Sequence, residues 1–416
     1  MAVVRGTAQD IESAYAWRRL AVALAVMTLG GSGMYSVAVV LPAVQAEFAV
    51  ARGDASLPYT LTMIGFGIGG VLMGRLTDRF GVMVTLLVGA VGIAAGFIAA
   101  GYATSLLQFS LASGLLIGLL GTSATFAPLV ADTSLWFTRR RGIAVAICIS
   151  GNYLAGALWP PLMQHFVQSV GWRQTYIGVG VICFVTMLPL ALLLAKRPPH
   201  PLASNAGARH AAVGAVPHTD RPLGMSPNAL LTLLSVAGVA CCVAMAMPQV
   251  HIVAYCGDLG FGAARGAEML SLMLACGIVS RILSGWISDH IGGLRTLLLG
   301  SVLQGIALLL FLPFDELVSL YIVSALFGLF QGGIVPAYTL IVREYFTPAE
   351  AGARVGTVLM ATLFGMALGG WLSGAIFDWT GSYKAAFYNG LAWNGLNIFI
   401  TVMLLRRAKK MLPAAV

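Results

Sequence analysis

The chain has 416 residues, of which 59% are hydrophobic and 9% are charged, and its formal net charge is +9. Ordinary globular proteins carry about 25% charged residues. This composition excludes a water-soluble globular domain, and the high hydrophobicity excludes a disordered chain. In a chain of this hydropathy, the excess of cations is more informative about membrane topology than about nucleic-acid binding, which we do not expect. We therefore expect the chain to fold within a lipid bilayer.

Apolar segments long enough to cross a membrane recur along the whole chain. A transmembrane helix needs about 20 predominantly apolar residues, and runs of that length with few or no charges predict twelve helices. They occupy residues 20–45, 55–74, 80–131 (two helices), 142–172, 174–195, 222–257, 269–288, 296–314, 317–342, 355–377 and 385–405. The predicted fold is an all-α membrane protein with twelve transmembrane helices.

The basic residues are distributed unevenly between the two predicted sides of the membrane. With the N-terminus in the cytoplasm, 18 of the 24 Lys and Arg residues fall in cytoplasmic segments, and only Arg52, Arg173, Arg265 and Lys384 fall outside. Cytoplasmic loops of membrane proteins are enriched in Lys and Arg. We therefore expect a multi-pass protein of the cell membrane with both termini in the cytoplasm. The N-terminal segment has no cleavage site behind a short apolar core, so no signal peptide is predicted.

A polar linker divides the chain into two halves that resemble each other. Residues 196–228 contain six prolines and three of the six histidines. The string GRLTDRFG at residues 74–81 recurs as GWISDHIG at residues 285–292, and WFT at residues 136–138 recurs as YFT at residues 345–347. The third landmark, Gly171, recurs as Gly381, so the offset stays near 210 throughout. A near-constant offset indicates an internal repeat.

The repeat predicts five parts of the chain, comprising a cytoplasmic N-terminal segment, two six-helix bundles joined by a cytoplasmic linker, and a cytoplasmic tail. Their predicted bounds are 1–19, 20–195, 196–228, 229–405 and 406–416. Transporters built from such repeats bind their substrate near the bilayer midplane, at the interface of the repeats.

The string at residues 74–81 resembles the loop signature of the major facilitator superfamily and lies where that signature is expected, between the second and third spans. The basic pair that usually follows it is replaced by Val82 and Met83. Within the superfamily, WFTRRRG at residues 136–142, SGNY at residues 150–153 and Arg281, four residues before Gly285, resemble the monocarboxylate transporter and oxalate/formate antiporter branch. The resemblance implies a carrier that works by alternating access.

Arg281 is the one charged residue deep within a predicted span, about 12 Å along the helix from Asp289. An Arg at the centre of a membrane helix costs about 2.5–3.5 kcal/mol on insertion scales, so it should face a cavity or a partner. Its guanidinium can hold a carboxylate by two parallel hydrogen bonds. The alternative is an Arg satisfied by backbone carbonyls and water. The resembling families bind the substrate carboxylate with an Arg at this position.

The number of cations bears on the substrate. By the resemblance, a carrier of a dicarboxylate such as oxalate would place a second cation in the eleventh span, and residues 355–377 contain none. One cation suggests one carboxylate. Monocarboxylate transporters also place an Asp one turn before the Arg, where this chain has Gly277. His251 is the alternative candidate for a proton-linked step, because histidine has a reference pKa near neutral, although a packed interfacial histidine is also compatible with the sequence.

Several uncharged polar side chains in the spans need a cavity or an interhelical partner. Taken one at a time they are ordinary helix-packing residues, but together they could line a small pocket around Arg281. Gln331 and Tyr338 are seven residues apart, so we expect them to share one face of the tenth span. The candidate substrate-binding set is Arg281, Tyr35, Thr125, Asn152, His251, Gln331, Tyr338 and Asn394.

Four charged residues at predicted cytoplasmic ends of spans are expected to form a gating network. Asp132 lies about one turn from Trp136 at the end of the fourth span, and we expect it to join Asp78 and Arg79 in holding an inner gate. Asp289 is the counterpart of Asp78 in the second repeat. Such a network would break when the two halves move.

The leading hypothesis is a secondary active transporter of a small monocarboxylate, such as lactate or pyruvate, coupled to protons. The alternatives are an organic-anion exchanger of the oxalate/formate type and an efflux carrier for amphipathic compounds. No G-x-S-x-G, H-E-x-x-H or ATP-binding G-x-x-x-x-G-K motif is present, so neither an enzyme nor direct ATP drive is expected. The six cysteines contain no C-x-x-C pair, so no metal or cofactor is expected. Nothing points to an obligate protein partner.

Overall fold

The computed structural model describes residues 7–198 and 222–411, and these are helical nearly throughout. Part of the predicted linker (199–221) and both ends of the chain lie outside the described residues. The helices are η1 (Ala8–Asp10), α1 (Ala14–Gly30), α2 (Ser32–Phe48), α3 (Arg52–Ala55), α4 (Leu57–Phe80), α5 (Val82–Gly101), α6 (Leu106–Leu111), η2 (Ala112–Thr122), α7 (Ala127–Leu135), α8 (Arg141–Val170), α9 (Trp172–Leu193), η4 (Pro222–Gly224), α10 (Pro227–Asp258), α11 (Ala263–Ile291), α12 (Gly293–Leu310), α13 (Leu317–Gln331), α14 (Ile334–Tyr345), α15 (Pro348–Thr380) and α16 (Tyr383–Met411).

Eleven stretches among the described residues are long and apolar enough to cross a membrane. They agree with the first eleven predicted spans, although the first, second, fourth and tenth each consist of more than one helix. The twelfth predicted span lies in α16, which has 29 residues. Three asparagines, Asn389, Asn394 and Asn397, lower the hydropathy of α16.

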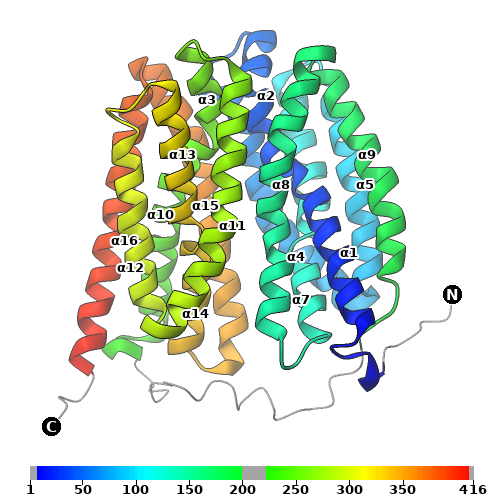
Figure 1. Cartoon of the computed structure of the whole chain (residues 1–416), viewed down its shortest axis with the longest axis vertical. Coiled ribbons are helices and arrows are strands. Elements are labelled where there is room, and N and C mark those ends of the chain that lie inside the picture. Colours follow the sequence, from blue (N-terminus) through cyan, green and yellow to red (C-terminus); the bar gives the residue numbers. More distant parts are fainter. Residues whose placement is uncertain (1–6, 199–221, 412–416) are drawn as a thin grey trace. The chain divides into compact units, whose positions relative to one another are not determined.

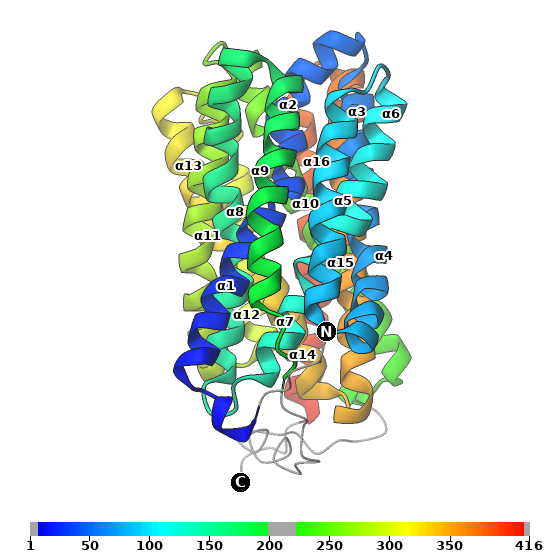
Figure 2. The ribbon, with the colours of Figure 1, turned by 90° about the vertical axis from the view of Figure 1, so that its right-hand side faces the viewer.

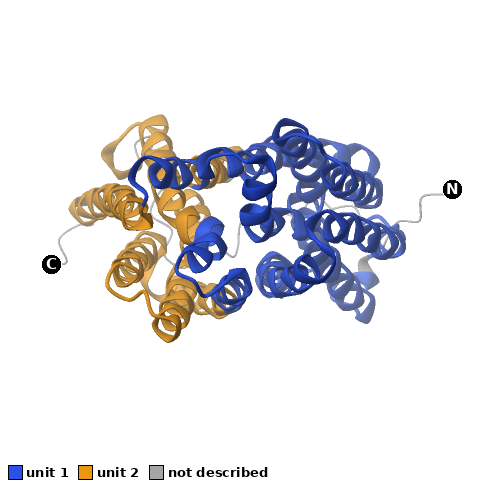
Figure 3. Ribbon diagram, turned by 90° about the horizontal axis from the view of Figure 1, so that it is seen from above, with its two compact units in different colours: residues 1–202, 249–275, 370–381 blue, residues 203–248, 276–369, 382–416 orange. Residues whose placement is uncertain are grey.

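The chain divides into two compact units (Figure 3). Unit 1 contains residues 1–202, 249–275 and 370–381, and unit 2 contains residues 203–248, 276–369 and 382–416. Unit 1 therefore holds the whole first half of the sequence together with one end of each of α10, α11 and α15. The remainder of these three helices belongs to unit 2.

In unit 1, α5 packs along α9 and against η2, and α1 packs along α8 (Figures 1 and 2). α4 also packs closely against η2, which is a stretch of π-helix. A Cβ atom on Gly118 would lie 2.5 Å from the carbonyl oxygen of Thr62, and one on Gly114 would lie 2.8 Å from Cβ of Leu61. These glycines at helical spacing therefore let two backbones meet, as small residues do in membrane helices.

In unit 2, α12 packs against α13, α14 and α16. A second pair of glycines at helical spacing lies between α15 and α10, where a Cβ on Gly365 or Gly369 would lie 2.5 Å from the carbonyl oxygen of Val239 or Val243. Glycine is the residue that permits this separation, because any side chain would overlap the neighbouring backbone.

The internal repeat is visible in the backbone. Gly81 and Gly292, which precede α5 and α12, have φ angles of +89° and +83°. Gly171 and Gly381, which precede α9 and α16, have φ angles of +85° and +66°. Only glycine adopts such angles without strain. The two halves thus turn in the same way at positions about 210 residues apart, which confirms the repeat predicted from the sequence.

Candidate functional site

Arg281 lies on α11 beside an interruption in the tenth span. The helix stops at Gln331, the last residue of α13, and restarts at Ile334, the first residue of α14. Nε of Arg281 lies 3.5 Å from the carbonyl oxygen of Gly332, a long contact at the limit of a hydrogen bond. The guanidinium is therefore placed at the ends of two half-helices, which is where transporters with discontinuous helices bind substrates and ions.

The interruption allows α11 to approach the tenth span closely. A Cβ on Gly332 would lie 2.5 Å from the carbonyl oxygen of Gly277 and 2.8 Å from Cβ of Ser280, and one on Gly333 would overlap the side chain of Ser284. Gly332 and Gly333 both keep right-handed helical dihedrals, and the expectation that Gln331 and Tyr338 share one face stays a prediction. The double glycine in an apolar span was the sequence signal for this interruption.

Three of the predicted pocket residues gather around a matching interruption in the first span, where α1 ends at Gly30 and α2 begins at Ser32. Thr125 is buried, donates its hydroxyl to the carbonyl oxygen of Thr122 at 2.9 Å, and packs directly on Gly30. Asn152 lies beside Gly31, with Nδ2 3.5 Å from the sulfur of Met34. Tyr35 is buried against Gly156, where a Cβ would lie 2.9 Å from its ring. Thr125, Asn152 and Tyr35 thus belong to unit 1.

His251 is fully buried in unit 1, and its Nε2 lies 2.8 Å from the carbonyl oxygen of Gly370 on α15. A carbonyl oxygen only accepts hydrogen bonds, so Nε2 carries the proton in this contact. The contact joins α10 to α15. It agrees with the packed-histidine interpretation, and the role in proton transfer stays a prediction.

Tyr338 and Asn394 belong to a buried hydrogen-bond network in unit 2. The hydroxyl of Tyr338 donates to Oδ1 of Asn397 at 2.9 Å, and Nδ2 of Asn397 donates to the hydroxyl of Ser301 at 2.7 Å. Nδ2 of Asn394 donates to the carbonyl oxygen of Ser301 at 2.9 Å. Every one of these four side chains is at most 1% exposed. Their hydrogen bonds join α12, α14 and α16, so the structure gives both predicted residues an interhelical role.

Asp132 has a different partner from the one predicted. It was expected to join Asp78 and Arg79, but its carboxylate accepts hydrogen bonds from Nε and Nη2 of Arg19 at 3.0 and 3.1 Å. Nη2 of Arg19 also donates to the carbonyl oxygen of Leu194 at 3.2 Å. The ion pair therefore ties α1 to α7 and to the end of α9.

Asp78, Arg79 and Asp289 are exposed, and in the described part of the chain no ion pair holds Asp78 or Asp289. Arg79 lies over the ring of Phe80, 5.2 Å from its centroid. The expected four-membered network is thus absent from this arrangement of the described residues.

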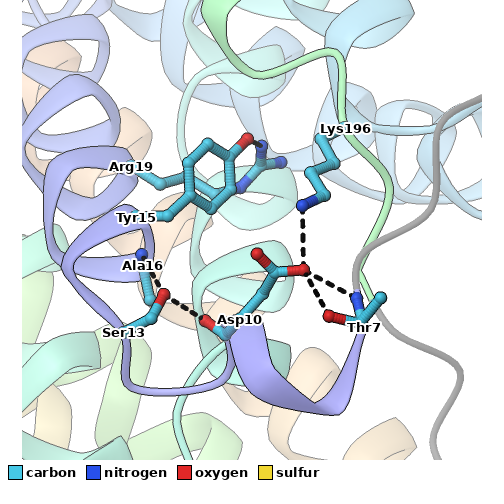
Figure 4. Close-up of polar contacts among 7 residues, drawn as sticks. All are labelled: Thr7, Asp10, Ser13, Tyr15, Ala16, Arg19 and Lys196. Atoms are coloured by element: carbon cyan, nitrogen blue, oxygen red, sulfur yellow. Dashed lines mark hydrogen bonds and ion pairs between the residues drawn. The ribbon is translucent and has the colours of Figure 1, made fainter.

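Residues 7–13, which precede α1, make polar contacts at the end of unit 1 that holds the Arg19–Asp132 ion pair (Figure 4). Nζ of Lys196 lies 2.8 Å from Oδ2 of Asp10, and this hydrogen bond lowers the pKa of Asp10 to about 2. The carboxylate of Glu12 accepts the backbone N–H groups of Thr138 and Arg140 at 3.1 and 2.7 Å, which lowers its pKa too. The turn before α8 is therefore held by the N-terminal segment, a contact that the sequence did not indicate.

The family model of the Major Facilitator Superfamily matches residues 21–317 and 258–415. The chain belongs to the Major Facilitator Superfamily. It is a multi-pass membrane transporter, and the two matches together cover both repeats. A solved structure of a bacterial homolog to the human lysosomal transporter Spinster, in an inward-facing and occupied conformation, has the same fold, with a TM-score of 0.71, 14% identity and coverage of 97% of this chain and 100% of that one.

Curated relatives within the superfamily carry two kinds of name. Monocarboxylate transporter 13 of Bos taurus is 28% identical over 344 residues, which are 80% of this chain and 75% of the relative. Agnestins efflux protein AgnL12 of Paecilomyces divaricatus is 22% identical over 335 residues, or 80% of this chain and 72% of the relative. These similarities support the branch that the sequence motifs resemble, and the relatives include both a monocarboxylate transporter and an efflux protein.

Proposed function

We propose that this protein carries a small monocarboxylate across the cell membrane by alternating access, coupled to protons, with Arg281 holding the substrate carboxylate. The observation that supports the proposal is the place of Arg281, on a membrane-spanning helix and at the ends of two half-helices. A charge at that depth is costly without an anionic or polar partner, and a bound carboxylate supplies the opposite charge through two parallel hydrogen bonds.

The identity of the carboxylate-binding residue sets the expected substrate class. α15, which contains the whole of the eleventh span, has no Lys or Arg after Arg354 at its cytoplasmic end. A single guanidinium matches a single carboxylate, which favours a monocarboxylate over a dicarboxylate. The similarity to Monocarboxylate transporter 13 supports the same choice. Gln331 is the polar residue that we retain as a candidate for contacts with the rest of the substrate, because it lies at the same interruption as Arg281 in unit 2.

The test is uptake of labelled short-chain acids into proteoliposomes with and without an imposed proton gradient. A charge-assisted hydrogen bond contributes about 1.5–3 kcal/mol, so Arg281→Ala should lower kcat/KM for the acid by about 10- to 150-fold. Arg281→Lys should retain part of the activity, since an ammonium supplies the charge but not the two-pronged geometry. Arg265→Ala is the control, because Arg265 is an exposed cation of the same helix, ion-paired with Glu268 at 3.0 Å.

Three results decide between the carrier types. Saturable uptake that needs Arg281 and rises with an inward proton gradient supports the proposal. Uptake that ignores the gradient and responds to trapped internal acid indicates an organic-anion exchanger. If no acid is transported, and Arg281→Ala leaves the extrusion of a fluorescent amphipathic compound intact, the efflux alternative is correct and the carboxylate proposal fails.

A further inference from the structure

One arginine of the first half of the chain is bound to the ends of two helices from the second half, all within unit 1. Arg52 is 7% exposed, and its Nη1 and Nη2 donate to the carboxylate of Asp258, at the end of α10, at 2.9 and 3.2 Å. Nε donates to the side chain of Gln45, and the guanidinium lies over the ring of Phe377, 4.6 Å from its centroid. Every nitrogen of the guanidinium is therefore engaged.

The backbone at the same position holds the end of α15. Oδ1 and Oδ2 of Asp378 accept the backbone N–H groups of Arg52 and Gly53 at 2.8 and 2.7 Å. The two backbones are close together, since a Cβ on Gly53 would lie 3.1 Å from the nitrogen of Ala375 and one on Gly374 would lie 2.9 Å from the carbonyl oxygen of Arg52. A single turn of helix, α3, thus makes a side-chain ion pair with α10 and a backbone-to-carboxylate contact with α15.

The predicted topology places this cluster on the outside of the membrane, because Arg52 is one of the four basic residues of the outer loops. We propose that Arg52, Asp258 and Asp378 form an outer latch, which closes the outer end of the transporter and must break for that end to open. The proposal rests on the proposed function in one respect, namely that alternating access moves the ends of α10 and α15 away from α3.

The charges explain why such a latch can both hold and release. The side chain of Arg52 is 9% exposed and that of Asp258 is 38% exposed, so the ion pair is shielded on one side and reachable by water on the other. Separation exposes one cation and two carboxylates to water at the membrane surface, where hydration offsets much of the lost attraction. The latch should therefore bias the closed state without trapping it, and removing the guanidinium should shift the balance towards the open state.

The experiment measures the distance between α3 and α15 directly. Spin labels are attached to Asp54→Cys and Trp379→Cys, whose native side chains are exposed, in protein reconstituted into nanodiscs after the six native cysteines are replaced. The short-distance population should dominate in the parent protein. Arg52→Ala should raise the ratio of long to short distances by about tenfold or more, which corresponds to loss of one charge-assisted contact.

A matched control is available at the same end of unit 1. The ion pair between Arg173 and Glu47 has a length of 2.7 Å, but both residues belong to the first half of the chain. Arg173→Ala should leave the distance distribution unchanged. Because the cysteine-free background could fold poorly, hydrogen exchange of the native-cysteine protein is the second measurement, and the amides of Arg52 and Gly53 should exchange faster in Asp378→Asn than in the parent.

The outcomes separate the latch from the transport proposal. An unchanged distance distribution in Arg52→Ala, or unchanged exchange of the two amides in Asp378→Asn, would overturn the latch even if monocarboxylate uptake is found. A longer-distance population in Arg52→Ala supports the latch, even if no acid is transported and the substrate assignment fails.

Discussion

The ion pair between Arg19 and Asp132 gives the most direct test of how the structure holds its cytoplasmic end together. The two side chains are only 3% and 6% exposed, and their closest atoms are 2.9 Å apart. The guanidinium also lies 4.6 Å from the ring centroid of Trp136. Asp132→Ala would leave the buried cation of Arg19 without its counter-charge.

Burial sets the size of the expected effect. Exposed ion pairs contribute about 0.2–1 kcal/mol, whereas removing one partner of a buried pair costs about 3–5 kcal/mol. We expect Asp132→Ala to fall in the second range. For a unit of about 240 residues, 1 kcal/mol corresponds to about 2–4 °C, so the melting temperature in nanodiscs should fall by at least about 6 °C.

A double variant distinguishes the loss of attraction between Arg19 and Asp132 from the cost of leaving Arg19 buried without a counter-charge. Replacement of a buried ion pair by apolar residues of similar volume is often close to neutral, so Arg19→Met with Asp132→Leu should melt several degrees above Asp132→Ala alone. Arg173→Ala, which breaks an exposed pair, provides the comparison and should shift the melting temperature by no more than about 4 °C. If Asp132→Ala shifts it no more than this control, the assignment of a buried, structural ion pair is wrong.

Three further outcomes are expected. Tyr338→Phe leaves the buried amide oxygen of Asn397 unsatisfied and should lower the free energy of unfolding by about 1–3 kcal/mol. The KM for the transported acid should stay unchanged, because a rise in KM would indicate that Tyr338 contacts the substrate. Gly333→Ala should lower kcat/KM because the new Cβ overlaps Ser284, whereas Gly285→Ala, with nothing within 4 Å, should not. The pKa of Asp10 is lowered to about 2 by its hydrogen bond with Lys196. The contribution of this contact to stability is therefore complete above about pH 4 and is lost as the pH falls towards 2. Asp10→Asn should destabilise the protein equally at pH 5 and pH 8, as measured by thermal unfolding.

The sequence predicted the fold well because lipid restricts the choice of structure to a few possibilities. A helix satisfies all of its own backbone hydrogen bonds, so apolar runs of suitable length could be converted directly into spans, and eleven of the twelve are apolar enough in the structure to cross a membrane. The repeat was equally accessible, because the glycines at its landmarks are needed for positive φ angles, as at Gly81 and Gly292.

The partners of individual polar residues were harder to predict from the sequence, because they depend on which helices meet and at what level along their axes. The sequence predicts Asp78 and Arg79 as neighbours of Asp132, but its partner in the structure is Arg19, which is 113 residues away on α1. The sequence favours a substrate pocket for Tyr338 because a polar residue in a span needs a partner, and the structure supplies that partner as Asn397 on α16. Periodicity gives the face of a helix, and it does not give the neighbour of that face.

These two cases help to explain why Arg281 keeps its place in the proposed site. An uncharged polar residue within a membrane helix can be satisfied by one neighbouring amide or hydroxyl, as Tyr338 is, so its presence says little about substrate. A guanidinium has five donors and a full charge, and Arg19 and Arg52 each contact a carboxylate of their own chain. Arg281 lies on α11, and its Nε is 3.5 Å from the carbonyl oxygen of Gly332 at the interruption of the tenth span. The substrate carboxylate that we propose at Arg281 would be held by the same kind of charge-assisted hydrogen bonds that Arg19 and Arg52 make to Asp132 and Asp258.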